Sequence, residues 1–371
     1  MEWTRPAEVF PPGEHLRDEL EARGWSQMDL AEILGVSVAS INEVINNKRG
    51  ITAEMAAGLS DAFGTSAEFW MNLDARYRLY STEPKPARQQ RAAIFAKVPV
   101  REMVKRGWIL PSNSSEVLAA AACQFLRIDS LDQEAKPLAF AARKAATYDE
   151  RTPAQTAWLC RAGFLADGVA AEAGFDPARL PDLASDLRRL ALEVECVDQV
   201  PRVLSHYGVR FVVVEPLSVS RVEAVTFRHS DGQPVIAMSL RLGKLNNFWH
   251  NLLHEVAHIR AGDDLVLDTD SSFEGAGLPP AEQEANRFAV ETLIPSERMK
   301  AFIDQKRPAF TLAEVKRFAM QVGVHPAIVI GQLAHAKEVT WARFGAHLPG
   351  IRERIIAAAV TDGWGHEGTH A

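Results

Sequence analysis

The sequence predicts a mainly α-helical protein with a small β-sheet, an α+β arrangement spread over two or three domains. Three observations support this class. Residues 14–80 contain five short helical segments separated by turn signals, and residues 88 to about 200 are Ala- and Leu-rich with helical periodicity. Short apolar strands then precede an apolar helix that ends near Ile259. At 371 residues, the chain is long enough for ample cores.

The first predicted domain covers residues 1–80 and contains two helices joined by a tight turn. One helix begins at Ser26 and ends near Gly35, and Ser37 caps a second helix that runs to about Asn46. Gly35 falls at the turn, where glycine adopts a left-handed backbone at little cost. Apolar residues along both helices would hold them at the helix-turn-helix angle. The second helix is therefore the predicted recognition helix for a DNA major groove.

The residues predicted to contact DNA form two groups. Those nearest the base edges are Ser37, Val38, Ala39 and Ser40, and those near phosphates are Gln27, Lys48 and Arg49. Charge opposes tight binding, because residues 1–80 hold 7 Lys and Arg against 13 Asp and Glu. We therefore expect strong DNA binding to require a dimer. The alternative is a motif that serves only in dimerisation or partner docking.

Residues 81–200 are predicted to form a helical connector. Pro84 and Pro86 disfavour helix and indicate a hinge after the first domain. The remainder has helical periodicity, and residues 170–173 and 183–192 are typical of its helical segments. The sequence indicates no arrangement of catalytic side chains in this region.

Residues 201–340 are predicted to form a domain in which a small sheet precedes a helix with metal-binding spacing. Strands are predicted at residues 209–214, 224–227 and 235–239. The helix contains His254-Glu255-Val256-Ala257-His258. Because residues four apart share a helical face, both imidazoles can point at one ion. The spacing predicts zinc-assisted hydrolysis, with His254 and His258 as ligands and Glu255 as general base.

A catalytic zinc needs a third protein ligand, and a second predicted helix offers two glutamates. Pro279-Pro280 begins this helix. Glu282 shares a face with small residues that allow a neighbouring helix to approach, whereas Glu284 shares a solvent-type face with Arg287. Glu282 is therefore the predicted third ligand. Asn286, one turn later, would hydrogen-bond the free nitrogen of a ligating histidine.

Other histidines and acids near the motif admit two interpretations. His250 lies one turn before His254, and we expect a packed histidine, with a ligand or substrate contact as the alternative. The acidic residues between 263 and 274 are expected to form a solvated loop, with a rim of the substrate cleft as the alternative. Residues 341–371 are predicted to be a C-terminal helix and a flexible tail that contains His366 and His370.

The segment from Asn247-Phe248-Trp249 through His258, followed by Glu-x-x-Ala-Asn from Glu282 and then Leu-Ile-Pro, resembles the ImmA/IrrE family of zinc metallopeptidases. The resemblance implies a zincin-like domain with one Zn²⁺ per chain and Glu282 as third ligand. It also implies that residues 311–335 close the peptidase domain, although their pattern superficially repeats the helix-turn-helix. His250-Asn251 depart from the Phe-Thr common in that family, but do not touch the presumed ligands.

The stretch from Pro12-Gly13 to Phe69-Trp70 resembles HigA-type antitoxins of the XRE helix-turn-helix class almost without gaps. This resemblance implies a homodimer that binds operator DNA and, when paired, a toxin. It also implies that residues 81–200 correspond to the helical linker of fused HigA–ImmA/IrrE regulators.

Composition indicates a cytoplasmic protein. Hydrophobic residues make up 47% of the chain and charged residues 24%, which is typical of soluble globular proteins. No apolar run approaches membrane-spanning length, and the N-terminus lacks the apolar segment of a signal peptide. Three widely spaced cysteines are expected to be reduced core thiols.

The predicted function is that of a DNA-binding transcriptional regulator fused to a zinc-dependent endopeptidase that cleaves a regulatory partner protein. The alternative is a HigA-like antitoxin or repressor that binds DNA and a toxin or other protein. In that alternative, the zinc site is structural or sensory and does not turn over substrate.

Overall fold

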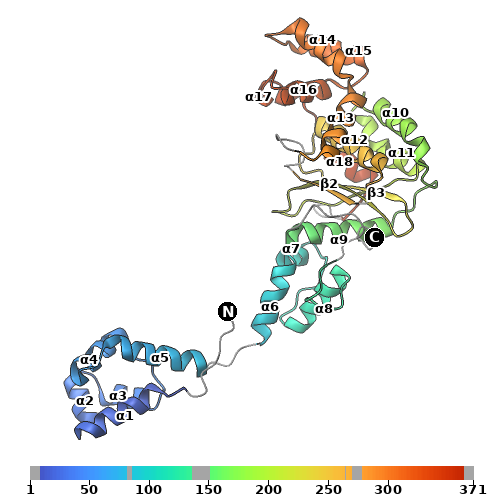
Figure 1. Cartoon of the computed structure of the whole chain (residues 1–371). Helices are drawn as coiled ribbons and strands as arrows, with labels where there is room; N and C mark the ends of the chain where they lie inside the picture. Colours follow the sequence, from blue (N-terminus) through green and yellow to red (C-terminus); the bar gives the residue numbers. More distant parts are fainter. Residues whose placement is uncertain (1–8, 82–85, 136–150, 264, 270–277, 363–371) are drawn as a thin grey trace. The chain divides into compact units, whose positions relative to one another are not determined.

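The computed structural model describes residues 9–81, 86–135, 151–263, 265–269 and 278–362. They belong to two compact units, Met1–Pro86 and Ala87–Ala371 (Figure 1). The predicted hinge at Pro84 and the tail histidines His366 and His370 lie outside the described residues. The mainly α-helical α+β class predicted from the sequence is confirmed.

Residues 9–81 of the first unit fold into five helices: α1 (Pro12–Arg23), α2 (Gln27–Leu34), α3 (Val38–Ile45), α4 (Ala53–Phe63) and α5 (Ala67–Ser81). Helix α2 begins with a capping box, in which Ser26 and Asp29 satisfy each other's backbone N–H groups. It ends at Gly35, whose φ of 66° is left-handed, and Ser37 caps α3. The predicted helix-turn-helix is therefore confirmed.

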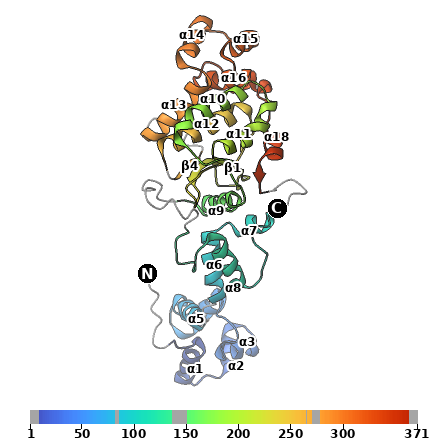
Figure 2. The same ribbon diagram turned by 90° about the vertical axis from the view of Figure 1, so that its right-hand side faces the viewer.

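The described part of the second unit contains a five-stranded mixed sheet between two layers of helices (Figures 1 and 2). The strands are β1 (Arg210–Val213), β2 (Val222–Arg228), β3 (Pro234–Met238), β4 (Leu265–Thr269) and β5 (Val360–Thr361). Their order is β4-β2-β3-β1-β5. Strand β1 is parallel to β3 and β5, whereas β2 is antiparallel to β3 and β4.

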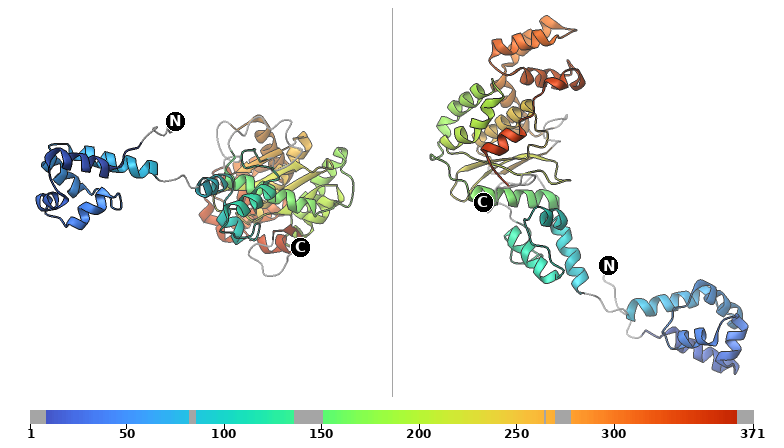
Figure 3. Two further views of the ribbon diagram at one scale, coloured as in Figure 1. Left: turned by 90° about the horizontal axis from the view of Figure 1, so that it is seen from below. Right: turned by 180° about the vertical axis from the view of Figure 1, so that it is seen from behind.

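One face of the sheet shares a hydrophobic core with α6 (Pro86–Lys97), α7 (Val100–Lys105), α8 (Ser115–Leu126) and α9 (Pro153–Asp167). The other face packs in a second core with α10 (Leu180–Leu190), α11 (Val200–His206), α12 (Leu245–Ala261) and α13 (Pro280–Leu293). That core also contains residues of α14 (Ser296–Lys306), α15 (Leu312–Val322), α16 (Pro326–His335), α17 (Trp341–Phe344) and α18 (Arg352–Ala358). Figure 3 shows the same layers from below and from behind.

Helices of the predicted connector pack directly against the sheet. Trp158 of α9 is fully buried, and its Nε1 donates a hydrogen bond to the Val214 carbonyl oxygen at 3.0 Å. Successive residues of β1 point to opposite sides, with Phe211 in one core and Val212 in the other. Because both faces of the strands are apolar, both must be covered, and the helices before the sheet cover one of them.

Two strands were missed by the sequence prediction. Strand β4 lies in the segment predicted to be a solvated acidic loop, and β5 lies in the segment predicted as a C-terminal helix and tail. Each is a sheet edge whose pairing partner, β2 or β1, is distant in the sequence. Conversely, residues 170–173, which were predicted to be helical, are irregular. Helix α9 ends before them, at Asp167.

Candidate metal centre

Helix α12 carries the His-Glu-x-x-His motif and is buried over most of its length. Its apolar residues pack between the sheet and α13, and Gly262, with a left-handed φ of 78°, ends it. His254 and Glu255 are 0% exposed, and His258 is 1% exposed. Polar groups this deeply buried require hydrogen-bond or ion partners. The partners of these three side chains therefore define the chemistry of the site.

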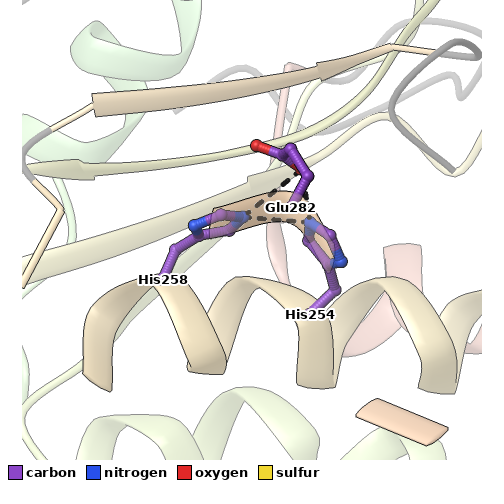
Figure 4. Close-up of side chains that lie close together, drawn as sticks. All are labelled: His254, His258 and Glu282. Carbon is purple, nitrogen blue, oxygen red and sulfur yellow. Dashed lines mark hydrogen bonds and ion pairs between the residues drawn. The ribbon is translucent and has the colours of Figure 1, made fainter. Parts of the chain in front are cut away.

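Both motif histidines converge on one carboxylate of helix α13 (Figure 4). His254 Nε2 and His258 Nε2 lie 3.0 Å apart, and the Glu282 Oε2 atom is 3.2 Å from the first and 3.7 Å from the second. One ligand atom from each of the three residues lies within 4.8 Å of the others. Two imidazoles and one carboxylate on packed helices are a donor set that could hold a single ion.

The two glutamates of α13 occupy opposite environments. Glu282 is 3% exposed and faces α12, whereas Glu284 is exposed and forms an ion pair with Arg287 on its own helix. Burial acts to raise the pKa of Glu282, but its interactions with His254 and His258 outweigh burial and lower that pKa to about 2. The carboxylate is therefore ionised at neutral pH, as a metal ligand must be.

A carboxamide and a carboxylate orient the two imidazoles from outside the triad. The Asn286 Oδ1 atom lies 2.9 Å from His254 Nδ1, and the Asp263 Oδ2 atom lies 2.9 Å from His258 Nδ1. Acceptors at both Nδ1 atoms favour the tautomers that present the Nε2 lone pairs to a common point. The sequence predicted the contact between Asn286 and a ligating histidine, but it assigned Asp263 to a solvated loop. The position of Asp263 just after Gly262, where the helix ends, is the signal that could have identified this residue.

Glu255 points to the sheet rather than to Glu282. The hydroxyl of Thr226, on strand β2, donates a hydrogen bond to Glu255 Oε2 at 2.5 Å. Thr226 faces the opposite side of β2 from Val225 and Phe227, which lie in the core shared with α6 to α9. This contact fixes the orientation of the carboxylate one residue from His254. Sequence reasoning did not identify Thr226, because strand register alone does not show which residue meets the helix.

His250 does not join the triad. Its ring stacks against His335 of α16 at 6.4 Å between centroids, and the His254 ring is 6.2 Å away. Burial lowers the pKa of His250 to about 3, with the neighbouring histidines adding to the effect. The ring is therefore neutral at neutral pH.

Removal of the Asp263 carboxylate is expected to weaken metal binding without abolishing it. The substitution Asp263→Asn keeps the side-chain volume but removes the charged acceptor for His258, so we expect the affinity of the triad for a divalent metal ion to fall by about 10–100-fold. Competition with a chromophoric chelator measures the change. Asp304→Asn, at an exposed position on α14, is the matched control. Equal affinities for the Asp263 variant and the wild type would exclude an orienting role.

In the first unit, the residues predicted to contact DNA surround the start of α3. Ser37, Val38 and Ala39 are exposed, and Ser40 is half-buried. Arg49 Nη1 donates to the Ser40 hydroxyl at 3.2 Å. Gln27, at the start of α2, accepts a hydrogen bond from Asn42 of α3 at 3.2 Å. Lys48 is exposed beside Arg49.

In comparisons with known proteins, the two units match different families. Residues 16–70 match the helix-turn-helix family HTH_3, and residues 206–325 match the Peptidase_M78 family, described as the IrrE N-terminal-like domain. The chain is thus a fusion of a regulator-type DNA-binding domain and a peptidase-family domain. It belongs to the XRE-type helix-turn-helix proteins through its first unit and to the IrrE N-terminal-like family through its second.

Two of the relatives match the first unit and cover about a quarter of this chain. Virulence-associated protein I of Dichelobacter nodosus is 40% identical over 90 residues, which are 24% of this chain and 79% of that protein. Antitoxin HigA-1 of Vibrio cholerae is 36% identical over 94 residues, 25% of this chain and 83% of the relative. A solved structure described as Pseudomonas aeruginosa antitoxin HigA with higBA promoter is 44% identical over the matched region. That region covers 20% of this chain and 82% of the chain in that structure, with a TM-score of 0.20.

The first unit is therefore a DNA-binding helix-turn-helix domain with HigA-like antitoxin relatives. In the described part of the chain, none of the helices is both long enough and apolar enough to span a membrane.

Proposed function

We propose that the chain is a DNA-binding transcriptional regulator with a zinc-dependent endopeptidase domain that cleaves a regulatory partner protein. The observation that carries the peptidase assignment is the convergence of His254, His258 and Glu282, with Glu255 beside them on the same helix. Membership of residues 206–325 in a peptidase family supports it.

The donor set fits zinc. Catalytic zinc sites use three nitrogen or oxygen donors from the protein and leave a fourth position open, and His254, His258 and Glu282 provide such a set. When bound, zinc supplies a Lewis acid that polarises a carbonyl and makes water more acidic. Asn286 and Asp263 fix the two imidazole rings, so the protein reorganises little as the ion binds.

Glu255 is the proposed proton carrier. Its carboxylate would take the proton of the attacking water molecule and deliver it to the leaving amine of the cleaved peptide. The hydrogen bond from Thr226 holds one carboxylate oxygen and so keeps the group oriented for both transfers. Because Glu255 is absent from the cluster of ligand atoms, it can act as a base without coordinating the ion.

Metal content tests the zinc site directly. Purified wild-type protein is expected to contain about one zinc per chain, and His254→Ala is expected to lose it. His250→Ala is the matched control, because His250 lies one turn away on the same helix and outside the triad, and it should retain the metal. Elemental analysis after dialysis against a weak chelator gives the ratio. A metal-free wild type, or loss of metal in the control, would contradict the proposed ligands.

The first unit is proposed to bind operator DNA as a homodimer through the start of α3. Ser37, Val38 and Ala39 are exposed there, and Arg49 and Lys48 offer two positive charges to the phosphates. The recognition helix α3 contains no Lys or Arg, so a single copy would neutralise few phosphates. Two copies double that number, which supports a homodimer as the binding form.

Loss of the two basic side chains is expected to weaken DNA binding. The double substitution Lys48→Ala with Arg49→Ala should lower affinity by about tenfold or more and reduce the salt slope by roughly 2 per protomer. Fluorescence anisotropy with the DNA upstream of the gene, at several salt concentrations, measures both quantities. Arg76→Ala, an exposed arginine on α5, is the control and should change neither. An unchanged slope in the double variant would place the DNA contacts elsewhere.

A second candidate function is that of a HigA-like antitoxin with a structural or sensory zinc site. The similarity of the first unit to Antitoxin HigA-1 favours it. Removal of the Glu255 carboxylate alone separates the two candidate functions, because it should abolish the activity of a peptidase but not that of an antitoxin.

A further inference from the structure

A large cavity lies beside the metal triad in the second unit. Its volume is about 770 Å³, within the range of pockets that hold ligands of drug size. It is lined by the first turns of α12, the later turns of α13, and by α14 and α16. Figures 1 and 2 show α14 and α16 on the side of α12 and α13 that faces away from the sheet.

The cavity approaches the triad without being formed by it. Asn286 lines the cavity and also contacts His254 through its Oδ1 atom. His250 lines the cavity too, with its ring 6.2 Å from that of His254. An extended peptide advances about 3.3–3.6 Å per residue. A peptide that occupies the cavity would therefore come within about two residues of the triad.

The lining combines side-chain amides with apolar side chains. The amides are Asn246, Asn247, Asn251, Asn286 and Gln332, and the apolar side chains include Val290, Met299, Ile303 and Ile328. Asn246 is 6% exposed, and among the described residues neither its Oδ1 atom nor the Oε1 atom of Gln332 accepts a hydrogen bond. Buried carbonyl oxygens without donors are costly, so a ligand that brings N–H groups would be stabilised.

Charge in the described lining is nearly balanced. Arg241 forms an ion pair with the buried Glu223, with its Nε atom 2.7 Å from Glu223 Oε1. Arg307 pairs with Glu338. The exposed Lys300 and Asp304 add one charge of each sign. The cavity therefore favours an uncharged ligand with hydrogen-bonding groups and apolar side chains over a strongly acidic or basic one.

We propose that this cavity binds an uncharged, apolar segment of the polypeptide substrate next to the peptide bond to be cleaved. A polypeptide supplies the backbone N–H groups that the two amide oxygens lack and the apolar side chains that fit the other wall. The inference rests on the proposed peptidase function, since that function is what makes the neighbour of the triad a substrate site.

Peptide binding tests the proposal without requiring turnover. The probes are acetylated and amidated hexapeptides that differ only in their two central residues, which are leucine, glycine, lysine or glutamate. The protein is the full chain carrying Glu255→Gln, so that the probe stays intact. Isothermal titration calorimetry is expected to show that the leucine peptide binds at least about tenfold more tightly than the others, because its side chains leave water.

Two tryptophan substitutions on α14 locate the binding site. Ile303→Trp fills part of the cavity and should remove the preference for leucine, whereas Gln305→Trp, at an exposed position outside the lining, should retain it. Equal affinity for all four peptides, or a leucine preference that survives Ile303→Trp, would overturn the proposal. Metal content and cleavage are measured separately, so failure of the peptidase function is distinguishable from failure of this subsite.

Discussion

Replacement of Glu255 by glutamine is expected to leave zinc bound and to lower the rate of peptide cleavage by about 10²–10⁴-fold. Glutamine has nearly the same shape as glutamate but accepts no proton at neutral pH. The ligand atoms of His254, His258 and Glu282 are unaffected, because Glu255 lies outside their cluster. A denatured protein is incubated with the wild type or the variant, and mass spectrometry of its fragments over time gives the cleavage rate. Elemental analysis gives the metal content.

Thr226→Val is the companion to that experiment. It removes the hydroxyl that donates to Glu255 Oε2 while it keeps the side-chain volume and the carboxylate itself. We expect a smaller loss of rate than for Glu255→Gln, with metal content unchanged. Cleavage that persists at the wild-type rate in Glu255→Gln would refute the proposed mechanism and leave the antitoxin candidate.

Substitution of the two glutamates of α13 should give opposite results. Glu282→Ala removes a ligand, and we expect its effect on zinc affinity to exceed the roughly 10–100-fold loss that follows removal of an orienting partner. Glu284→Ala should retain wild-type affinity, because that side chain is exposed and, among the described residues, forms an ion pair only with Arg287. Chelator competition at constant pH measures both variants.

Glu282→Gln separates charge from packing in the same test. The amide fills the same buried space but lacks the negative charge that both histidines face, so the affinity should fall almost as far as in Glu282→Ala. Thermal unfolding of the metal-free proteins shows whether the substitution damages the fold itself. Zinc loss in Glu284→Ala together with retention in Glu282→Ala would reassign the third ligand.

Local patterns in the sequence predicted the first unit well. Ser26, Gly35 and Ser37 act on their own helix ends, and the structure places the capping box, the left-handed turn and the second cap at these residues. Helical phase likewise placed Glu282 and Glu284 on different faces of α13, because that difference depends only on the 100° rotation between successive residues.

The second unit shows where such reasoning stops. The sequence does not indicate strand β4, because the strand is short and its pairing partner β2 lies about forty residues earlier in the chain. The alanine-rich periodicity of the helices before the sheet likewise does not show that α9 covers β1. Both features depend on contacts between segments distant in the sequence.

The class of fold, the helix-turn-helix and the spacing that brings His254, Glu255 and His258 to one helix could all be predicted from the sequence. These features depend on a single periodicity or on neighbours a few residues apart. The contact of Thr226 with Glu255, the contact of Asp263 with His258 and the cavity that four helices line beside Asn286 are visible only in the folded protein. Each of these contacts joins two separate elements, or a helix and the loop that follows it. They depend on how the elements pack against one another, and no local sequence pattern specifies that packing.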